Sequence, residues 1–289
     1  MSLFKKYLNS YVFETTLPGK GIDVSFRPVT TGQIKKLLLY ETSNDPMSIE
    51  NALDEVMQEC IVKPDDFDIK DQYVQDRFFL LVEMRKATRG AQYNFQTECS
   101  SCGSQTQQML NLSSLPVTVL NKNKKEVKKQ TLPSLVKPKR GKLVEKTEDI
   151  TEQPKVDEKY EWDVVKLNTN ISIRLTLITR GMQQEAYDIF KLNHNSNIND
   201  INEIEKTLEI TTALYALSIV SVITPEGEET NLPLEERIFL LDNIQQSEQE
   251  KISKWFEDHD FGLDFSFDVK CSHCGFTEKK AVPVENFFY

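Results

Sequence analysis

Two short cysteine motifs carry the clearest chemical signal in this sequence. The first is Cys99-Ser100-Ser101-Cys102-Gly103, and the second, Cys271-Ser272-His273-Cys274-Gly275, lies close to the C-terminus. A Cys-x-x-Cys turn presents two thiolates to one metal ion, and a structural zinc ion takes four such ligands in a tetrahedron. Each motif is therefore half of a zinc site. Either each pair finds two more ligands nearby, or the two pairs share one ion.

The supply of other ligands favours a shared ion. The chain has only three histidines, and none of them is near the first motif. We therefore expect one structural zinc ion per chain, bound by Cys99, Cys102, Cys271 and Cys274, which would couple metal binding to folding. A disulfide within each motif and reduced surface thiols are the alternatives, although redox motifs of this type usually start a helix after a buried strand. Catalytic zinc is disfavoured because four thiolates leave no position for water.

Alternating apolar residues flank both motifs in the same way. Phe95 precedes the first motif and Phe267 precedes the second at the same spacing, each within an alternating run that is typical of a strand. Apolar residues at positions 110 and 112, and at 282 and 284, continue this pattern after each glycine. The sequence therefore predicts two hairpins of the zinc-ribbon type, each with a strand, a metal-binding turn and a second strand.

Outside the motifs, the sequence predicts helices and small sheets in two similar halves. A strand at 24–29 leads into a helix in the first half, and a strand at 171–178 does so in the second. Apolar periodicity predicts further helices at 48–62, 73–86, 201–222, 234–244 and 249–256. We expect an α+β fold, with helical layers, small antiparallel sheets and two ribbon-like hairpins that share the four-cysteine site. The repeated order of elements is compatible with an internal duplication.

A charged segment separates the two halves. Basic residues crowd positions 122–142, where only Glu126 is acidic, although the whole chain has a formal net charge of −10. Prolines and weak periodicity predict that 118–157 is a linker or long insertion between an N-terminal half, 1–117, and a C-terminal half, 158–289. This segment would be a solvated connector, an arm that grips nucleic acid or an acidic protein groove, or an extended piece docked on a neighbouring subunit.

Composition excludes some classes of protein. Apolar residues make up 39% of the 289 residues, which is enough for a core of ordinary size, and no apolar run approaches membrane-spanning length. The N-terminus lacks the apolar stretch of a secretory signal, so we expect synthesis in a reducing cytoplasm. The acidic balance argues against a general nucleic-acid coat. A zinc-ribbon protein that binds nucleic acid through 122–142 is the alternative function, and its affinity would fall steeply with salt.

Sequence motifs for catalysis are missing. The chain has no glycine-rich phosphate loop, no GxSxG and no HExxH, and Cys60 lies in an apolar run typical of a small core residue. Arg85 and Arg89 lie four residues apart at a predicted helix end, where they would either stabilise the helix dipole or bind a partner. We therefore expect a protein that is not an enzyme and that acts through its contacts.

The order of several motifs resembles one known family. These motifs are Phe26-Arg27-Pro28-Val29-Thr30, Leu81-x-x-Met84-Arg85-x-x-Thr88-x-Gly90, the two cysteine motifs and the terminal Phe287-Phe288. In this order they resemble the baseplate hub proteins of T4-like bacteriophages, over most of residues 22–115 and 160–289. Met84 stands where the family pattern has leucine, and the charged segment is longer than that pattern needs.

The resemblance implies a structural or assembly component of the baseplate hub of a contractile tail. Such a protein is made in the host cytoplasm, contacts other hub proteins and acts in the virion tail baseplate. Neither the oligomeric state nor the choice between a resident subunit and an assembly chaperone follows from the sequence. We expect the zinc ion to fix the two helical layers relative to each other, and Phe287-Phe288-Tyr289 either to finish the core or to dock on a partner as an aromatic plug.

Overall fold

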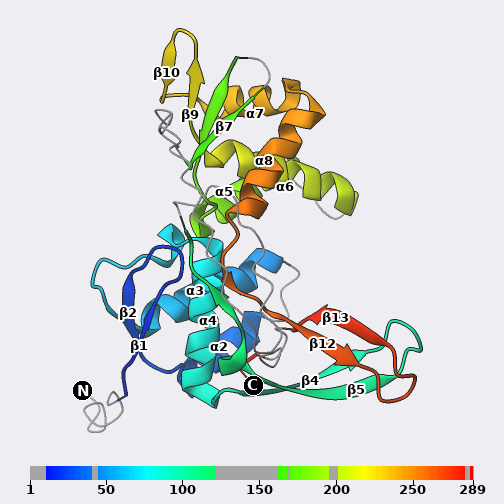
Figure 1. Ribbon diagram of the computed structural model, residues 1–289. Coiled ribbons are helices and arrows are strands. Elements are labelled where there is room, and N and C mark those ends of the chain that lie inside the picture. The colour runs from blue at the N-terminus through cyan, green and yellow to red at the C-terminus, as the bar shows by residue number, and fades with distance from the viewer. Residues whose placement is uncertain are drawn as a thin grey trace, which may run out of the picture.

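The computed structural model describes residues 11–40, 45–121, 162–167, 170–194, 201–283 and 287–288. These residues form helices and small antiparallel sheets, so the predicted α+β class is confirmed (Figure 1). Of the predicted linker, only its first four residues are described, and the basic stretch 122–142 lies outside the described residues. The proposed boundaries between the halves therefore stay a prediction.

The first half contains a three-stranded antiparallel sheet with a helix pair inserted in it. Strands β1 (Phe13–Thr16) and β2 (Asp23–Phe26) form a hairpin, and β3 (Ile61–Lys63) pairs with the other edge of β2. Helices α2 (Thr31–Tyr40) and α3 (Pro46–Cys60) lie between β2 and β3 in the chain. Because β3 follows α3 without a loop, the helix pair packs close to the sheet.

The second half repeats this arrangement. Strands β7 (Val164–Lys166) and β8 (Ser172–Leu175) form an antiparallel pair, and β9 (Ile219–Thr224) pairs with the other edge of β8. Helices α5 (Arg180–His194) and α6 (Glu203–Ser218) lie between β8 and β9. The strands β2 and β8, which occupy equivalent places in the two halves, each have a register shift near their end. The two halves are therefore alike in this detail as well as in the order of their elements.

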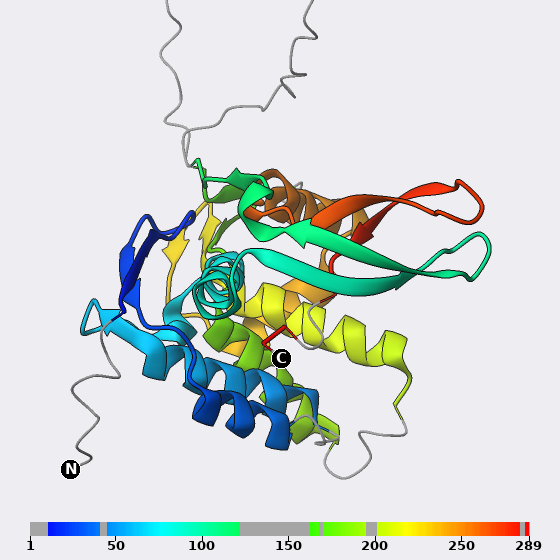
Figure 2. The same ribbon diagram turned by 90° about the horizontal axis from the view of Figure 1, so that it is seen from below.

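Two long hairpins project from the body of the molecule (Figure 2). Helix α4 (Val74–Arg89) leads into the first, which pairs β4 (Gln92–Glu98) with β5 (Gln105–Asn111). The second pairs β12 (Ser266–Lys270) with β13 (Thr277–Ala281) near the C-terminus. Seen from below, the hairpins lie side by side with their turns at the same end, although most of the chain separates them in sequence.

Shorter elements complete the fold. They are β6 (Val117–Thr118), which pairs with β11 (Gly262–Leu263), strand β10 (Gly227–Glu229) beside β9, helices α7 (Leu234–Asn243) and α8 (Gln246–Asp258), and the 3-10 turns η1 (Ile69–Asp71) and η2 (Leu112–Ser114). Helices α6, α7 and α8 lie in the upper part of the molecule as drawn in Figure 1, and α2, α3 and α4 lie in the lower part.

Two predicted helices end earlier than the periodicity indicates. The helix predicted over 201–222 stops at Ser218, and the residues from Ile219 to Thr224 form β9 instead. In the same way, the helix predicted over 48–62 gives way to β3 after Cys60. Both corrections have one physical reason. Runs of β-branched residues favour the pleated surface of a sheet, and the middle strand beside them supplies hydrogen-bond partners.

The observed helix caps explain where two helices begin. Asp45 caps α3 by accepting a hydrogen bond from the Met47 backbone N–H at 3.1 Å, so the helix starts before position 48, where the periodicity predicts its first residue. Asn202 caps α6 by accepting a bond from Ile204 N–H at 3.0 Å. Each side chain satisfies a backbone donor that has no partner inside its helix.

Buried apolar side chains form two cores. The first contains residues of β2, α3 and α4 together with Tyr93, Leu112 and, from the far end of the chain, Val282, Phe287 and Phe288. The second contains residues of β8, β9 and α8, among them Ile173, Ile219 and Trp255. The C-terminal phenylalanines Phe287 and Phe288 are buried in the first core, so of the two alternatives given for them, completion of the core is the one that the structure supports.

A buried ion-pair network joins the helices of the two halves. Asp54 of α3 accepts hydrogen bonds from Arg77 Nε of α4 at 2.5 Å and from Arg180 Nε of α5 at 2.7 Å. Arg180, only 1% exposed, also donates to Asn51 at 3.0 Å, and Arg77 pairs with Glu50 at 2.8 Å. One carboxylate therefore holds three helices together across the boundary between the halves.

Candidate metal centre

The four predicted cysteine ligands come together at the turns of the two hairpins. The Sγ atoms of Cys99, Cys102, Cys271 and Cys274 all lie within 4.8 Å of one another. Cys99 is 3.7 Å from Cys274, and Cys102 is 3.8 Å from Cys271, so each close pair joins one hairpin to the other. In each motif the first cysteine is buried and the second is exposed. Residues from distant parts of the chain thus form one cluster.

Both motifs fold into the same tight turn. In the first, Gly103 N–H donates to Cys99 C=O at 2.9 Å, and Cys99 N–H donates to Ser104 C=O at 3.0 Å. In the second, Gly275 N–H donates to Cys271 C=O at 3.0 Å, and Cys271 N–H donates to the carbonyl of the residue after the glycine at 2.8 Å. Gly103 and Gly275 have φ values of 68° and 74°, which residues with a Cβ rarely adopt. The glycine therefore lets each turn present both sulfurs on one side.

The spacing of the sulfurs fits a tetrahedral ion and does not fit disulfides. Four thiolates at about 2.3 Å from a central zinc ion are about 3.8 Å from one another. The close contacts of 3.7 and 3.8 Å agree with this edge length, whereas a disulfide would bring two sulfurs to about 2.05 Å. All five cysteines of the chain are free. Four soft sulfur donors without an oxygen ligand suit zinc better than calcium or magnesium.

The environment of the sulfurs affects their ionisation unequally. The Ser104 hydroxyl and the backbone N–H groups of Cys274 and His273 lower the pKa of Cys271 to about 5. The Ser104 hydroxyl also lowers the pKa of Cys102. The backbone N–H of the residue after Gly275 acts to lower the pKa of Cys274, but desolvation and the three neighbouring thiols raise it to about 11. Negative charge on one sulfur makes ionisation of its neighbours more costly.

Polar contacts connect the two turns independently of the cysteines. The backbone N–H and the hydroxyl of Ser100 both donate to the Glu278 carboxylate, at 3.1 and 2.6 Å. Lys280 donates to the backbone carbonyl of Glu98 and pairs with Glu278 at 3.3 Å. Sequence reasoning missed these residues, because serine, glutamate and lysine beside a turn are common and carry no specific signal.

Aromatic packing fixes the hairpins where they leave the body. Phe95 of β4 and Phe267 of β12, the residues that marked the two strands in the sequence, meet edge to face with ring centroids 5.0 Å apart. Nearer the body, Tyr93 contacts Phe287 at 5.2 Å and donates its hydroxyl proton to Pro283 C=O at 2.8 Å. The cysteine cluster therefore joins two hairpins that already pack on one core. The Asp54 network joins helices of the two halves as well, and the expectation that a metal fixes the helical layers stays a prediction.

Comparison with known proteins gives one match. A family model described as T4 bacteriophage base plate protein matches residues 8–289, nearly the whole chain. The chain belongs to this family. No curated protein and no solved structure matches the chain. Membership in the base plate family confirms the resemblance seen in the order of the motifs, and it gives this protein a place in the baseplate of a phage tail.

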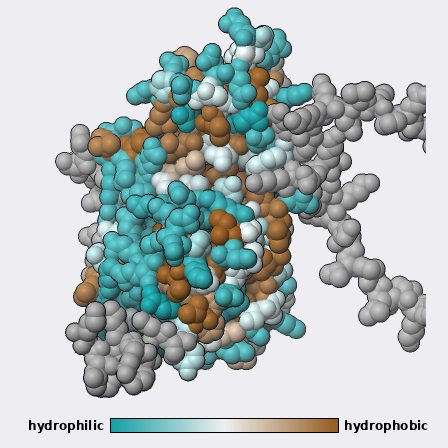
Figure 3. Space-filling model, turned by 90° about the vertical axis from the view of Figure 1, so that its left-hand side faces the viewer, coloured by the Kyte–Doolittle hydropathy of each residue, from teal (hydrophilic) through white to brown (hydrophobic). Residues whose placement is uncertain are grey.

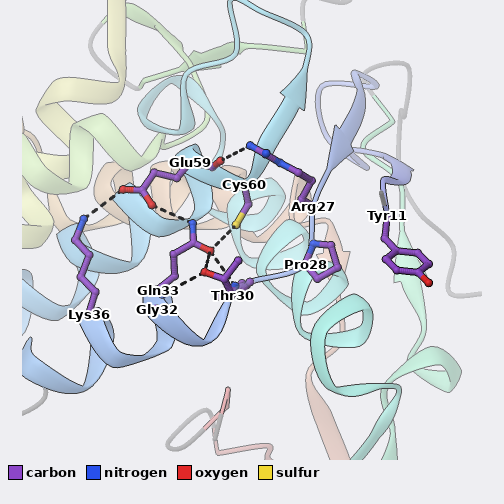
Figure 4. Close-up of a pocket in the computed structure, with 10 residues that line it drawn as sticks. Tyr11, Arg27, Pro28, Thr30, Gly32, Gln33, Lys36, Glu59 and Cys60 are labelled. Atoms are coloured by element: carbon purple, nitrogen blue, oxygen red, sulfur yellow. Dashed lines mark hydrogen bonds and ion pairs between the residues drawn. The ribbon is translucent and has the colours of Figure 1, made fainter. Parts of the chain in front are cut away.

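A pocket of about 620 Å³ lies beside the Arg27-Pro28 segment of this base plate protein (Figure 4). Arg27 donates to the Glu59 backbone carbonyl at 3.2 Å, and the Gln33 amide donates to the Glu59 carboxylate at 2.9 Å. The thiol of Cys60 faces Gln33, and burial raises its pKa to about 11, so this cysteine stays protonated near neutral pH. Cys60 is therefore a core residue, as its apolar neighbours in the sequence predict, and its thiol is poorly suited to nucleophilic chemistry.

Arg85 has a structural role in the base plate protein. Its guanidinium donates to Gly90 C=O at 2.8 Å, just after the end of α4, and lies over the rings of Tyr93 and Phe287. The side chain is buried, whereas Arg89 is exposed. The interpretation of Arg85 as a stabiliser of the helix end therefore agrees with its contacts better than a role in partner binding.

Two further findings concern the alternatives to a structural role. Two of the three lysines beside the second motif have partners within the protein, since Lys279 pairs with Asp264 at 3.2 Å and Lys280 contacts the first hairpin. Lys270, directly before the turn, is exposed. Within the part of the chain that the structure describes, no helix is both long and apolar enough to cross a membrane.

Proposed function

We propose that this base plate protein is a structural or assembly component of the baseplate hub, held in its working shape by one zinc ion. Four sulfurs from two distant hairpins converge at the spacing of a tetrahedral thiolate site, and this observation carries the proposal. The two hairpins would be ribbons that share a single site formed by Cys99, Cys102, Cys271 and Cys274. Zinc would supply structural cross-linking, because four thiolates leave no open position for a substrate or water.

Contacts with other proteins are the proposed mode of action. Side chains that suit interface cores are exposed on the described surface, and hydrophobic residues interrupt the hydrophilic face shown in Figure 3. The largest exposed apolar residues include Tyr11, Leu39, Met109, Leu192 and Phe239. We propose that the partners are other hub proteins, that the protein is not an enzyme, and that it assembles in the host cytoplasm before it joins the tail.

Metal analysis of the purified chain tests the zinc site. We expect one zinc per chain in the wild type and in Cys60→Ser, whose thiol lies in the core away from the cluster. Zinc should be lost from Cys99→Ser and from Cys271→Ser alike, because each substitution removes a ligand from the same ion. Two zinc ions per chain, or loss of only half the metal in each variant, would overturn the shared site.

The hub role needs a separate experiment. We expect the protein to co-purify with hub complexes from infected cells and to cross-link to other hub proteins. Quantitative mass spectrometry of intact virions then distinguishes a resident subunit, present at a fixed ratio to other baseplate proteins, from an assembly factor that is present only in the precursors. Recovery with the outer baseplate and without any hub protein would contradict the proposal.

A further inference from the structure

We propose that Ser104 is a positioning residue of the metal centre, whose hydroxyl hydrogen-bonds thiolates of both cysteine motifs. The inference rests on the zinc site proposed above. Ser104 Oγ lies 3.1 Å from Cys102 Sγ and 3.2 Å from Cys271 Sγ, and these two sulfurs come from different hairpins. A thiolate has no proton to give, so the hydroxyl is the donor, and its single proton is shared between the two sulfurs as a three-centre hydrogen bond.

The backbone of the first turn holds Ser104 in this position. Its carbonyl accepts the hydrogen bond from Cys99 N–H at 3.0 Å that closes the turn, and its side chain is half-buried. The backbone therefore already holds the Ser104 side chain beside the sulfurs, so little conformational freedom is lost when the hydroxyl hydrogen-bonds them. Such a preorganised donor contributes more to a site than a mobile one does.

The second motif has no equivalent donor. Phe276 occupies the position that corresponds to Ser104, and its carbonyl makes the same turn-closing bond with Cys271 N–H at 2.8 Å. A phenylalanine side chain cannot donate to a thiolate. Among the described residues, Ser104 provides the one hydroxyl that contacts a sulfur of the cluster. One serine from the first turn therefore serves a cysteine of each turn, and the centre is asymmetric although the two turns have the same backbone.

The chemistry of a four-thiolate zinc centre gives this hydrogen bond its importance. Four thiolates carry more negative charge than one zinc ion neutralises, so hydrogen bonds to the sulfurs disperse the excess charge. Partners of this kind orient metal ligands, and their loss typically weakens metal binding about 10-fold or more. Since Ser104 contacts Cys102 and Cys271 together, it also helps to hold the two hairpins in register around the ion.

Cobalt substitution and zinc competition test the role of Ser104. The variants are Ser104→Ala, which keeps the backbone carbonyl, and Ser104→Thr, which keeps the hydroxyl. The control is Ser101→Ala, which changes an exposed serine of the same turn that makes no hydrogen bond within the described chain. We expect Ser104→Ala to bind zinc about 10-fold more weakly in competition with a chelator. Its sulfur-to-cobalt charge-transfer bands should move to lower energy, because the thiolates lose a hydrogen bond.

The other variants separate this role from general damage to the fold. Ser104→Thr and Ser101→Ala should match the wild type in zinc affinity and in the cobalt spectrum. A Ser104→Ala variant with wild-type affinity and unshifted bands would overturn the proposal while the zinc site itself stands. A wild-type chain that binds neither zinc nor cobalt would overturn the proposed zinc site as well, so the two failures are distinguishable.

Discussion

Asp54 forms a buried point of contact between the two halves. Its carboxylate receives Arg77 from α4 and Arg180 from α5, and all three side chains are buried. A buried ion pair of this kind does not need to stabilise the fold much when it is complete, because desolvation offsets the attraction. Removing one member has a much larger effect, because the remaining charges stay buried without their partner.

Substitution of Asp54 measures this effect directly. We expect Asp54→Ala to lower the free energy of unfolding by about 3–5 kcal/mol, since it takes the ion-pair partner from buried Arg180 and leaves Arg77 with Glu50 alone. The matched control is Glu55→Ala on the same helix. Glu55 pairs with Lys36 at 2.7 Å but its side chain is 61% exposed, so its loss should cost less than about 1 kcal/mol. Urea unfolding of both variants provides the comparison, and equal losses would contradict the role of Asp54.

Gly19 has a different constraint, which is lack of space. Its N–H donates to the Asp76 carboxylate at 2.7 Å, and a Cβ at this position would lie 2.7 Å from the same carboxylate and against the ring of Phe261. Asp76 and Phe261 are both buried, so neither can move away easily. We expect Gly19→Ala to lower the free energy of unfolding by about 1–3 kcal/mol.

A second glycine supplies the control for this prediction. A Cβ at Gly32, in the first turn of α2, would meet no atom closer than 3.9 Å. Alanine is favoured over glycine in helices, so Gly32→Ala should leave the melting temperature unchanged or raise it slightly. Thermal unfolding of both variants compares the two positions. A Gly19→Ala protein as stable as the wild type would contradict the prediction, because it would show that the backbone at Gly19 can move away from Asp76 and Phe261 at little cost.

At the scale of elements, the sequence predicts the hairpins and most of the helices well. Alternation around Phe95 and Phe267 marks strands that are half-buried, and such strands have a clear period. Strands β3 and β9 were missed because each follows a helix without a glycine or proline between them. Their apolar residues continue the helical pattern, and only the β-branched residues, two in β3 and more in β9, indicate a change of structure.

In the candidate site too, features that depend on neighbouring residues could be predicted from the sequence, whereas contacts between residues far apart in the chain could not. The four cysteines could be grouped from the sequence, because a zinc ion takes four ligands and the first motif has no histidine near it. The structure brings their sulfurs together. Binding of a metal stays a prediction. The contact of Asp54 with Arg180 could not be predicted, because these residues are 126 positions apart and nothing near either one indicates its partner. Ser104 was missed for the same reason, since its second sulfur neighbour belongs to the other hairpin.

The start of α3 gives a prediction about pH. Asp45 caps this helix and also accepts hydrogen bonds from Lys191 at 2.6 Å and Tyr187 at 3.2 Å, both on α5. Desolvation acts to raise the pKa of Asp45, but the bonds from Lys191 and from Met47 N–H outweigh it and lower the pKa below its ordinary value of 3.8. Because the folded pKa is lowered, the stabilisation from ionised Asp45 is complete above 3.8 and is lost as pH falls through the folded value.

A comparison of Asp45→Asn with the wild type isolates this contribution. Asparagine still caps a helix but has no charge for Lys191. We therefore expect the variant to be less stable than the wild type at pH 6, with a difference that shrinks as the pH is lowered below 3.8. Chemical unfolding at several pH values gives this difference. A gap that stays constant down to pH 2 would mean that the charge of Asp45 contributes nothing.

The whole molecule combines a body, made of two similar sheet-and-helix units, with a separate clamp, made of the two hairpins that carry the cysteine turns. Both halves have a three-stranded antiparallel unit with two helices inserted before the third strand, and the same backbone bond closes each insertion. In the first half Arg27 N–H donates to Cys60 C=O at 2.8 Å, and in the second Thr176 N–H donates to Ser218 C=O at 2.9 Å. Each half also contains, toward its end, a hairpin with a cysteine turn, so the cluster forms where these two hairpins meet.

Removal of the proposed metal should therefore loosen the hairpins and leave the body folded. An isolated two-stranded hairpin is marginally stable in water, and most side chains of β5 and β13 are at least partly exposed. Hydrogen exchange measured with and without a chelator should show lost protection at 92–111 and 266–281. Protection of α3 and α5 should stay, because Asp54 and Arg180 hold them without the metal. Loss of protection throughout the helices would mean that the clamp supports the whole fold and that the ion-pair network cannot hold the halves together alone.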